Sequence, residues 1–476
     1  MNFSRIGFGC YRTDINIKEH YDALIKALTS GINLIDTSAN YADGRSEQLI
    51  GKVIDDLTAG GKLSREDMTL VTKGGYIQGQ NFRFASRLKA EGNPFSEVVE
   101  FADRLWHCIS PDFLQDQISR QLHRLNQEYI DIYLLHNPEY FLEHEKSLNT
   151  DLNTARKIYY ERIGKAFEFL ETKVREGKIG CYGISSNTFP VRSNEYTFTS
   201  LEEVLKTAES VSAGNHFRVI QMPFNLIEAG AVTNKNQSDN KLTVTEFACA
   251  NNIKILINRP LNAISSKGLV RFSDFSFDAF NEKDFIRQIR LVRLMEDDFM
   301  DERIANEYLS GDEVKEFGKL FEFGRLIEEN WKFFGSIEHF NDMIMQNFAP
   351  KISAVTRLTE EKISDEDLKK FSADYIKETY LLLNFVGNYY KMKAAKRSSF
   401  IHGLINKNLD GKYHSLTLSQ KTMLLLASVN GIDGILAGIR KESYVDDALQ
   451  ILSAEKIKNA KEIIRFVSEE IEISAA

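Results

Sequence analysis

The sequence lacks the features that mark secreted, membrane-spanning and metal-binding proteins. Its four cysteines stand alone, with no CxxC pair among them, so their spacing suggests neither a zinc site nor a disulfide framework. No run of about 18 apolar residues is present to cross a membrane, and the first residues do not show the charged-then-apolar pattern of a signal peptide. We therefore expect a soluble protein of the reducing cytoplasm, with no metal and no membrane partner.

An excess of positive charge is also missing. The formal net charge is -8 at pH 7 and the pI is near 5.8. One short basic cluster, residues 391–397, is typical of a solvated helix end rather than of a phosphate-binding track. Nucleic acid is therefore not an expected partner.

The chain has ample material for a folded core. Its 476 residues exceed the size at which one hydrophobic core usually stops growing. Hydrophobic residues make up 43% and aromatic residues 11%, which is typical of a globular protein and not of a disordered one. We expect either a large domain with a major insertion or two to three domains.

Apolar strand-like runs alternate along the chain with amphipathic helical stretches. Strands are expected at 32–35, 68–72, 130–135, 180–185, 219–222, 253–257 and 434–437, and helices at 46–57, 111–125, 160–176, 201–210, 243–251, 417–429 and from 443 onward. The polar stretch 76–110 predicts irregular structure. Seven or eight strand-helix units with nearly continuous apolar strands indicate a parallel sheet that is covered on both faces.

Two folds satisfy this pattern, a doubly wound sheet and a closed barrel. A doubly wound sheet normally has a GxGxxG turn after its first strand, but Gly7 and Gly9 are not followed by that spacing or by a helix. The sequence therefore predicts an α/β fold of the (β/α)8 TIM-barrel type. Active sites of such barrels lie at the C-terminal ends of the strands.

Polar residues stand at nearly every predicted strand end. Each residue taken alone also has a purely structural explanation. Lys73 can be a solvent-exposed lysine, His136 a hydrogen-bonded core residue, and Asp36 to Tyr41 a turn with the tyrosine packed over it. Their convergence at one end of a barrel favours a functional site. The strand-end residues are Asp36, Lys73, His136, Ser185, Ser186, Asn187, Gln221, Asn258, Arg259, Gly438 and Arg440.

Three of these residues, Asp36, Lys73 and His136, together with the neighbouring Tyr41, suit proton transfer. Tyr41 would normally titrate near 10, and a nearby Lys73 ammonium is expected to lower that value, while Asp36 keeps the ammonium charged and aimed. A neutral His136 can orient a carbonyl group by hydrogen bonding. Such a site suits delivery of a proton to a carbonyl oxygen while a cofactor delivers hydride to its carbon.

The chain resembles the aldo-keto reductase family over about residues 3–261 and 415–455. The residues that carry the resemblance are Asp36-Thr37-Ser38-Ala39-Asn40-Tyr41 with Gly44 and Ser46-Glu47, Thr72-Lys73, Leu134-Leu135-His136-Asn137-Pro138, Gly183-Ile184-Ser185-Ser186-Asn187, Gln221 and Leu436-Ala437-Gly438-Ile439-Arg440. The resemblance implies a (β/α)8 barrel that binds NADPH or NADH in extended form without a Rossmann domain.

The resemblance also implies a role for each residue. Tyr41 would be the general acid, Lys73 and Asp36 its tuning pair, and His136 the group that orients the carbonyl. The other implied residues bind the cofactor: Ser185, Ser186 or Asn187 with Gln221 at the nicotinamide carboxamide, Gly438, Arg440 and the following helix N-terminus at phosphate, and Asp447 at adenine.

The chain departs from the family pattern at cofactor positions. Asn258 stands where many members stack an aromatic ring on the nicotinamide, and Arg259 is a candidate to reach the pyrophosphate instead. Tyr444 occupies a place where members often carry an arginine for the adenosine 2′-phosphate. Because Arg440 or Lys441 can substitute, NADP(H) is preferred over NAD(H).

The largest departure is the interval 262–415, which separates a barrel part at 1–261 from another at 416–476. Apolar residues at three- and four-residue steps predict helices there, and their stripes favour a packed helical subdomain. Functional alternatives are a lid over the substrate mouth or an oligomer interface. The stripes are Phe317, Leu320, Phe321, Ile327 and Trp331, and Phe371, Tyr375, Leu382, Phe385 and Tyr389.

Two functions follow from these observations. The first is an NAD(P)H-dependent oxidoreductase acting on an aldehyde, ketone or sugar hemiacetal. The alternative is a nicotinamide-binding sensor or regulatory barrel with little catalysis, which uses the helical insertion to bind a partner. The set of Asp36, Tyr41, Lys73 and His136 favours the enzyme, because a sensor does not need the acid.

Overall fold

The structure is a computed structural model that describes residues 3–265, 268–300, 318–362 and 364–475. The chain divides into two compact units, residues 1–263 with 408–476 and residues 264–407. Each unit encloses a hydrophobic core of its own.

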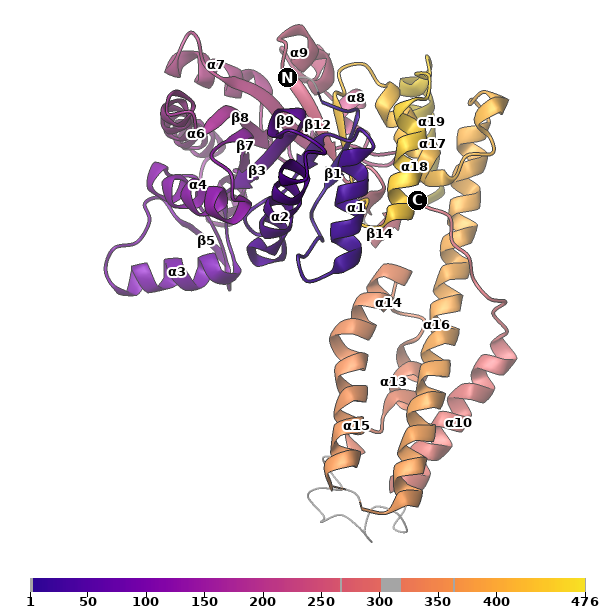
Figure 1. Cartoon of the computed structure of the whole chain (residues 1–476). Helices are drawn as coiled ribbons and strands as arrows, with labels where there is room; N and C mark the ends of the chain where they lie inside the picture. Colours follow the sequence, from indigo (N-terminus) through magenta and orange to yellow (C-terminus); the bar gives the residue numbers. More distant parts are fainter. Residues whose placement is uncertain (1–2, 266–267, 301–317, 363, 476) are drawn as a thin grey trace. The chain divides into compact units, whose positions relative to one another are not determined.

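The first unit is a closed barrel of eight parallel strands, which confirms the predicted (β/α)8 fold (Figure 1). Strand β1 pairs with both β15 and β2, so the sheet has no free edge. Around the barrel the strands are β1 (Ile6–Gly9), β15 (Gly434–Ala437), β12 (Lys254–Asn258), β9 (Phe217–Pro223), β8 (Ile179–Ser185), β7 (Ile130–His136), β3 (Thr69–Gly74) and β2 (Leu34–Asp36).

Strand β1 is absent from the strands expected from sequence. Its sequence, Ile-Gly-Phe-Gly, has the glycine content that weakens a strand signal. Inside the barrel the small residue is required, because a Cβ atom at Gly7 would lie 2.8 Å from Leu34 Cδ2. Gly7 therefore weakens the sequence signal of the strand and at the same time allows β1 to pack beside Leu34 in the barrel.

Helices surround the strands (Figure 1). Helix α4 has Pro111 at its first position, as expected, and Thr417 and Gln420 form a capping box at α17. The main helices are α1 (Lys18–Thr29), α2 (Arg45–Ala59), α4 (Pro111–Leu125), α6 (Leu152–Arg175), α7 (Leu201–Val211), α9 (Val244–Ala250), α17 (Leu418–Ser428), α18 (Glu442–Leu452) and α19 (Ala460–Ala475). The chain after residue 443 thus forms two helices rather than one.

Short elements connect these parts. They are η1 (Tyr41–Gly44), η2 (Arg65–Asp67), α5 (Tyr140–Ser147), α8 (Gly230–Thr233), η4 (Gly411–Tyr413) and a two-stranded sheet of β10 (Lys235–Gln237) and β11 (Leu242–Thr243). Side chains from seven of the eight barrel strands fill the interior: Leu34, Val71, Ile132, Leu134, Cys181, Val219, Leu256 and Leu436. This packed interior is a core and leaves the strand ends for chemistry.

The stretch 76–110 is ordered, so the expectation of irregular structure was wrong. It holds helix α3 (Gly79–Ala90) and a three-stranded antiparallel sheet of β4 (Tyr76–Ile77), β6 (Leu105–His107) and β5 (Val99–Ala102). Strands of two to four residues are too short for a periodic pattern, and only their mutual pairing defines them.

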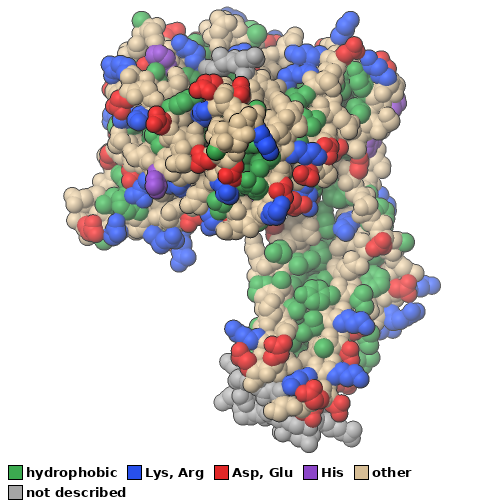
Figure 2. Space-filling model, viewed as in Figure 1, with side chains coloured by type: hydrophobic (Ala, Val, Ile, Leu, Met, Phe, Trp, Pro, Cys, Tyr) green, Lys and Arg blue, Asp and Glu red, His purple; other side chains and the backbone are tan. Residues whose placement is uncertain are grey.

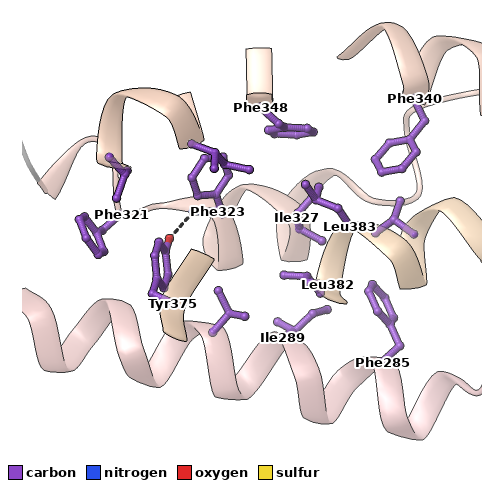
Figure 3. Close-up of a cluster of buried hydrophobic side chains, with 14 of the residues drawn as sticks. Phe285, Ile289, Phe321, Phe323, Ile327, Phe340, Phe348, Tyr375, Leu382 and Leu383 are labelled. Carbon is purple, nitrogen blue, oxygen red and sulfur yellow. Dashed lines mark hydrogen bonds between the residues drawn. The ribbon is translucent and has the colours of Figure 1, made fainter. Parts of the chain in front are cut away.

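The second unit is helical. Its elements are α10 (Glu282–Met300), α13 (Phe323–Asn330), α14 (Ile337–Met343), the π-helix η3 (Ile344–Phe348), α15 (Ala349–Lys362) and α16 (Glu366–Asn406). A small sheet of β13 (Asn262–Ser265) and β14 (Gly268–Arg271) precedes them. Figure 3 shows side chains from several of these helices meeting in one cluster.

The predicted apolar stripes lie in this cluster. Tyr375 and Leu382 of α16 are buried in it, and Phe371, Phe385 and Tyr389 pack against it, which confirms the predicted buried face. The other stripe contributes Leu320, Phe321, Ile327 and Trp331, while Phe317 lies outside the described residues. Aromatic side chains bury large apolar areas, and their packing in this cluster stabilises the helical unit.

A buried polar group is built into the same core. The Tyr375 hydroxyl donates to the Glu296 carboxylate at 2.8 Å and accepts the N–H of Phe323 at 3.3 Å (Figure 3). Glu296 also accepts the N–H of Gly324 at 2.6 Å. Burial raises the pKa of Glu296, and these hydrogen bonds oppose that shift.

Hydrophobic side chains also gather on the face of the helical unit seen in Figure 2. Large exposed apolar side chains of this unit include Leu294, Phe333, Met345 and Tyr380. Within the described part of the chain, no helix is both long and apolar enough to cross a membrane.

Candidate active site

A buried ion pair joins the C-terminal ends of strands β2 and β3. Lys73 Nζ lies 2.8 Å from Asp36 Oδ2, and neither side chain is more than 5% exposed. The ammonium also donates to the carbonyl oxygen of Thr37 at 2.8 Å. The lysine predicted as a strand-end residue therefore points inward and is not solvent-exposed.

Tyr41 completes this group from the turn that follows β2. Its hydroxyl oxygen accepts a hydrogen bond from Lys73 Nζ at 3.4 Å. The turn holds Ala42 and Asp43 at positive φ, a conformation that non-glycine residues seldom adopt and that often marks functional sites. Asp36, Lys73 and Tyr41 thus form one hydrogen-bonded chain.

Burial governs the titration of the three groups. It raises the pKa of Asp36 and lowers the pKa of Lys73, and the attraction between the two opposes both shifts. Burial also raises the pKa of Tyr41 well above 10, and Asp36 adds to that effect. The expectation that Lys73 would lower the pKa of Tyr41 was wrong for this structure, because burial and the carboxylate outweigh one ammonium at 3.4 Å.

His136 ends strand β7 on the other side of Tyr41. The two ring centroids lie 6.1 Å apart, edge to face, and His136 Nδ1 is 3.0 Å from the hydroxyl of Ser38. Burial lowers the pKa of His136 well below 6.5, and Lys73 lowers it further. The imidazole is therefore neutral at physiological pH, as expected for a group that orients a carbonyl.

Amide and hydroxyl groups extend the site across the barrel mouth. Gln221 Nε2 donates to Asp36 Oδ1 at 2.8 Å, and Gln221 Oε1 accepts from Ser185 Oγ at 3.1 Å and from Asn258 Nδ2 at 3.4 Å. The Oδ1 atom of Asn258 is buried without a hydrogen-bond partner among the described residues. An unsatisfied buried acceptor of this kind suits a ligand that donates to it.

Ser186 and Asn187, the two residues after Ser185, have different surroundings. The hydroxyl of Ser186 is buried beside Thr188 and Thr199, at 3.1 and 3.3 Å, so it supports the loop. Asn187 is partly exposed, and its backbone N–H donates to Glu139 Oε1 at 2.7 Å. The structure therefore brings Ser185 to Gln221 but sets Ser186 into a separate hydroxyl network.

The remaining predicted cofactor residues lie at the ends of β12 and β15. Arg259, at φ 52°, directs its guanidinium to Glu228, with 2.5 Å between Nη2 and Oε1. Gly438 and Arg440 lie between β15 and the first turn of α18.

Two positions on α18 complete the predicted set. Tyr444 is 43% exposed. Asp447 accepts a hydrogen bond from Gln420 Nε2 at 3.2 Å. Lys441 is the other cation considered for the 2′-phosphate, and its Nζ atom lies 3.3 Å from Glu19 Oε1.

Aromatic residues beside His136 were not identified as site residues from the sequence. Tyr76 meets His136 edge to face with 4.6 Å between ring centroids, and Tyr11 meets Tyr41 in the same way at 5.2 Å. His107 Nε2 lies 2.7 Å from the backbone oxygen of His136. The 76–110 segment therefore supplies Tyr76 and His107 as neighbours of His136, although neither periodicity nor spacing marks these residues in the sequence.

A second buried cluster supports Lys73 from behind. Glu47, on α2, is fully buried and accepts from Thr72 Oγ1 at 2.7 Å and from Arg124 Nε at 2.6 Å. Gln121 bridges Glu47 and the carbonyl oxygen of Lys73, at 2.9 and 3.0 Å. This network fixes the end of β3 without touching the mouth of the site.

Among the described residues, no group of three or more His, Cys, Asp or Glu side chains is placed to hold a metal ion.

Comparisons with known proteins identify relatives of this chain. Residues 5–290 match the sequence profile of the aldo/keto reductase family. The chain is 30% identical over 144 residues to an NADH-specific methylglyoxal reductase of Escherichia coli, a match covering 29% of this chain and 39% of that protein. It is 24% identical over 188 residues to an NAD(P)H-dependent D-xylose reductase of Scheffersomyces stipitis, covering 38% and 48% respectively. These matches span about half or less of each relative.

Solved structures of similar architecture include an aldo-keto reductase from Bacillus halodurans, at 14% identity and a TM-score of 0.48, covering 98% of this chain and 93% of that one. Another is an aldo/keto reductase from Klebsiella pneumoniae in complex with NADP and acetate, at 13% identity and a TM-score of 0.43, covering 98% and 91%. The match to the family profile spans more than half of the chain and carries the assignment: the protein belongs to the aldo/keto reductase family.

Proposed function

We propose that this protein is an NAD(P)H-dependent oxidoreductase that interconverts a carbonyl group and an alcohol, with Tyr41 as general acid and base. The carbonyl is that of an aldehyde, a ketone or a sugar hemiacetal in its open form. One observation carries the proposal: the buried ammonium of Lys73 donates at once to Asp36, Thr37 and Tyr41.

This arrangement sets the direction of the tyrosine proton. Because Tyr41 Oη accepts from Lys73, its own hydrogen is left to point away from the lysine and toward the mouth of the site. The raised pKa of Tyr41 keeps that proton in place at neutral pH. As negative charge develops on a carbonyl oxygen, Tyr41 can transfer its proton there, and the Lys73 ammonium stabilises the phenolate that remains.

His136 would hold the same carbonyl oxygen from the other side. Its Nδ1 atom is engaged by Ser38, which leaves Nε2 as the nitrogen that can face a substrate. A neutral imidazole with hydrogen on Nε2 donates one hydrogen bond without releasing a proton. Two donors aimed at one oxygen fix the orientation of the carbonyl carbon.

The residues at the barrel mouth fit a nicotinamide coenzyme. The unsatisfied Oδ1 of Asn258, with Gln221 and Ser185 beside it, can accept and donate hydrogen bonds to a carboxamide. A bound coenzyme would supply the hydride that no side chain can provide.

The phosphates have a separate place to bind. Gly438 is exposed, and a Cβ atom there would meet nothing within 4 Å, so the chain leaves room before the N-terminus of α18. Backbone N–H groups at a helix N-terminus favour phosphate.

The preference for NADP(H) over NAD(H) rests on Arg440. Arg440 lies in the loop before α18, and a guanidinium can bind a 2′-phosphate through two parallel hydrogen bonds. The relatives do not decide between the two coenzymes, because one is described as NADH-specific and another as NAD(P)H-dependent. We expect a higher kcat/KM with NADPH than with NADH.

The test is turnover of NADPH, followed by its absorbance, with a panel of aldehydes, ketones and sugars. Tyr41→Phe should abolish reduction while leaving coenzyme affinity nearly unchanged. Tyr21→Phe is the matched control, because it removes a phenol hydroxyl that bonds Asp56 on the surface. Reduction retained by Tyr41→Phe would contradict the assignment of the acid.

The same assay separates the enzyme from a regulatory barrel. Tight coenzyme binding without turnover across the panel would favour the sensor function. In that case the helical unit, with exposed Leu294, Phe333 and Met345, would be the surface to examine for a partner or a second copy of the chain. Size-exclusion chromatography with light scattering measures the oligomeric state directly.

A further inference from the structure

A buried carboxylate lies directly behind the nicotinamide end of the site. Glu139 follows His136, Asn137 and Pro138 and precedes the first residue of α5, and it is 1% exposed. Its Oε1 atom accepts the backbone N–H of Asn187 at 2.7 Å. Its Oε2 atom is buried without a hydrogen-bond partner in the described part of the chain.

The turn that carries Glu139 ties two strand ends together. Asn137 adopts φ 51°, and its N–H donates to the carbonyl oxygen of Ser185 at 2.7 Å. The Glu139 carboxylate adds a second link two residues further along, at Asn187. The loop that follows His136 at the end of β7 is thereby connected to the end of β8, which is proposed to hold the carboxamide.

The groups facing Glu139 do not neutralise it. They are Tyr140 and Glu143 of α5, Tyr159 of α6 and Tyr76 of β4. The described residues form no ion pair with Glu139, and Glu143 adds a like charge. Burial raises the pKa of Glu139 to about 7, and the N–H of Asn187 and the nearby Ser186 hydroxyl oppose that shift.

We propose that Glu139 is a positioning residue whose ionised carboxylate holds the Ser185–Asn187 strand end in the geometry that receives the nicotinamide carboxamide, so that protonation of Glu139 weakens coenzyme binding. This inference rests on the proposed function. A buried unpaired carboxylate costs stability, and an asparagine or glutamine could accept one N–H without that cost. The charge therefore has a use that a neutral amide does not serve, which is a hydrogen bond roughly twice as strong.

The sign of the effect follows from the titration. The carboxylate is ionised above pH 7 and increasingly neutral below it, so coenzyme affinity falls as the pH drops. If binding requires the ionised form, the apparent Kd rises in inverse proportion to the ionised fraction, or about tenfold between pH 8 and pH 6.

The experiment measures the Kd of NADPH and NADH from pH 6 to pH 8, without substrate, for the wild-type protein and Glu139→Gln. The glutamine keeps an oxygen that can accept from Asn187 but stays neutral. We expect the Kd of the variant to exceed that of the wild type by about tenfold or more at pH 8, and the ratio of the two Kd values to shrink about tenfold by pH 6. Because both proteins bind the same coenzyme, titration of its 2′-phosphate cancels in the comparison.

Glu171→Gln is the matched control. Glu171 is also a buried carboxylate that accepts a backbone N–H, from His216 at 2.6 Å, but it belongs to α6, and His216 directly precedes β9. It should leave the pH profile of coenzyme binding as in the wild type. Parallel pH profiles for the wild type and Glu139→Gln would overturn the inference, and so would an equal change in the control.

The two proposals fail in different ways. If neither coenzyme binds the wild-type protein at any pH, the proposed function is wrong and this inference falls with it. If the coenzymes bind and substrate is reduced, but Glu139→Gln does not alter the pH profile, only the role of Glu139 is wrong.

Discussion

Replacing Asp36 with asparagine removes one charge of the buried ion pair and leaves its size unchanged. Lys73 would then stay fully buried, with an amide in place of the carboxylate 2.8 Å from its ammonium. Breaking a buried pair in this way costs about 3–5 kcal/mol, because the remaining charge is uncompensated. We expect Asp36→Asn to lower the free energy of unfolding by about 3 kcal/mol, at the low end of this range. The asparagine oxygen and the Thr37 carbonyl oxygen can still accept hydrogen bonds from Lys73.

The loss of the carboxylate should also change the protonation of Lys73. Burial already lowers the pKa of Lys73, and Asp36 is the main influence that raises it again. In Asp36→Asn the lysine should therefore lose its proton more readily near neutral pH. A neutral amine stabilises the phenolate of Tyr41 far less, so kcat should fall by about 100-fold or more.

The assays are thermal unfolding followed by circular dichroism and turnover of NADPH with the best substrate of the panel. Asp56→Asn, at a surface position that bonds Lys52 and Tyr21, is the matched control and should leave turnover unchanged. Coenzyme binding by Asp36→Asn shows that the barrel is folded. Wild-type stability together with wild-type kcat in Asp36→Asn would refute the role given to the ion pair.

Three further predictions concern the role proposed for His136, the pH dependence of turnover and the stability of the second unit. Gly75→Ala should lower kcat by about 100-fold, because its Cβ atom would collide with the backbone oxygen of His136. At saturating coenzyme and substrate, kcat should be flat from pH 6 to pH 8, because the pKa of Tyr41 is raised above this range and that of His136 is lowered below it. Leu382→Ala should cost about 2–5 kcal/mol in denaturant unfolding of the helical unit, since the side chain is fully buried.

Matched substitutions check each of these. Gly214→Ala should be tolerated, because a Cβ atom there meets nothing within 4 Å. Leu381→Ala, at a neighbouring position that is 43% exposed, should change stability by less than about 0.5 kcal/mol. A kcat that changes steeply between pH 6 and pH 8 would mean that burial does not hold Tyr41 and His136 in one protonation state.

The barrel and most of the candidate site were predictable because their signals are local. A buried parallel strand is a continuous apolar run, and the polar residue that follows it must lie at the strand's end. This places Asp36, Lys73, His136 and Gln221 together once a barrel is assumed, and the structure joins Asp36 to both Lys73 and Gln221. The helical stripe of α16 was predictable for the same reason, since its period repeats over many turns.

Tertiary contacts decided the rest. Strand β1 is defined by its two partners and not by its own glycine-rich sequence, and the sheet in the 76–110 segment exists only through pairing between short strands. Arg259, the candidate to reach the pyrophosphate, is paired with Glu228, which lies 31 residues away in sequence. No spacing rule connects these pairs.

The sequence by itself determined which residue types stand at the strand ends, and therefore the class of chemistry that Asp36 and Tyr41 can perform. Only the tertiary structure decided how those groups titrate. Burial raises the pKa of Tyr41 where pairwise reasoning expected Lys73 to lower it, and folding brings the buried Glu139 to Asn187 with no ion-pair partner among the described residues. Desolvation depends on every atom packed around a group, and those atoms come from segments that are distant in the chain.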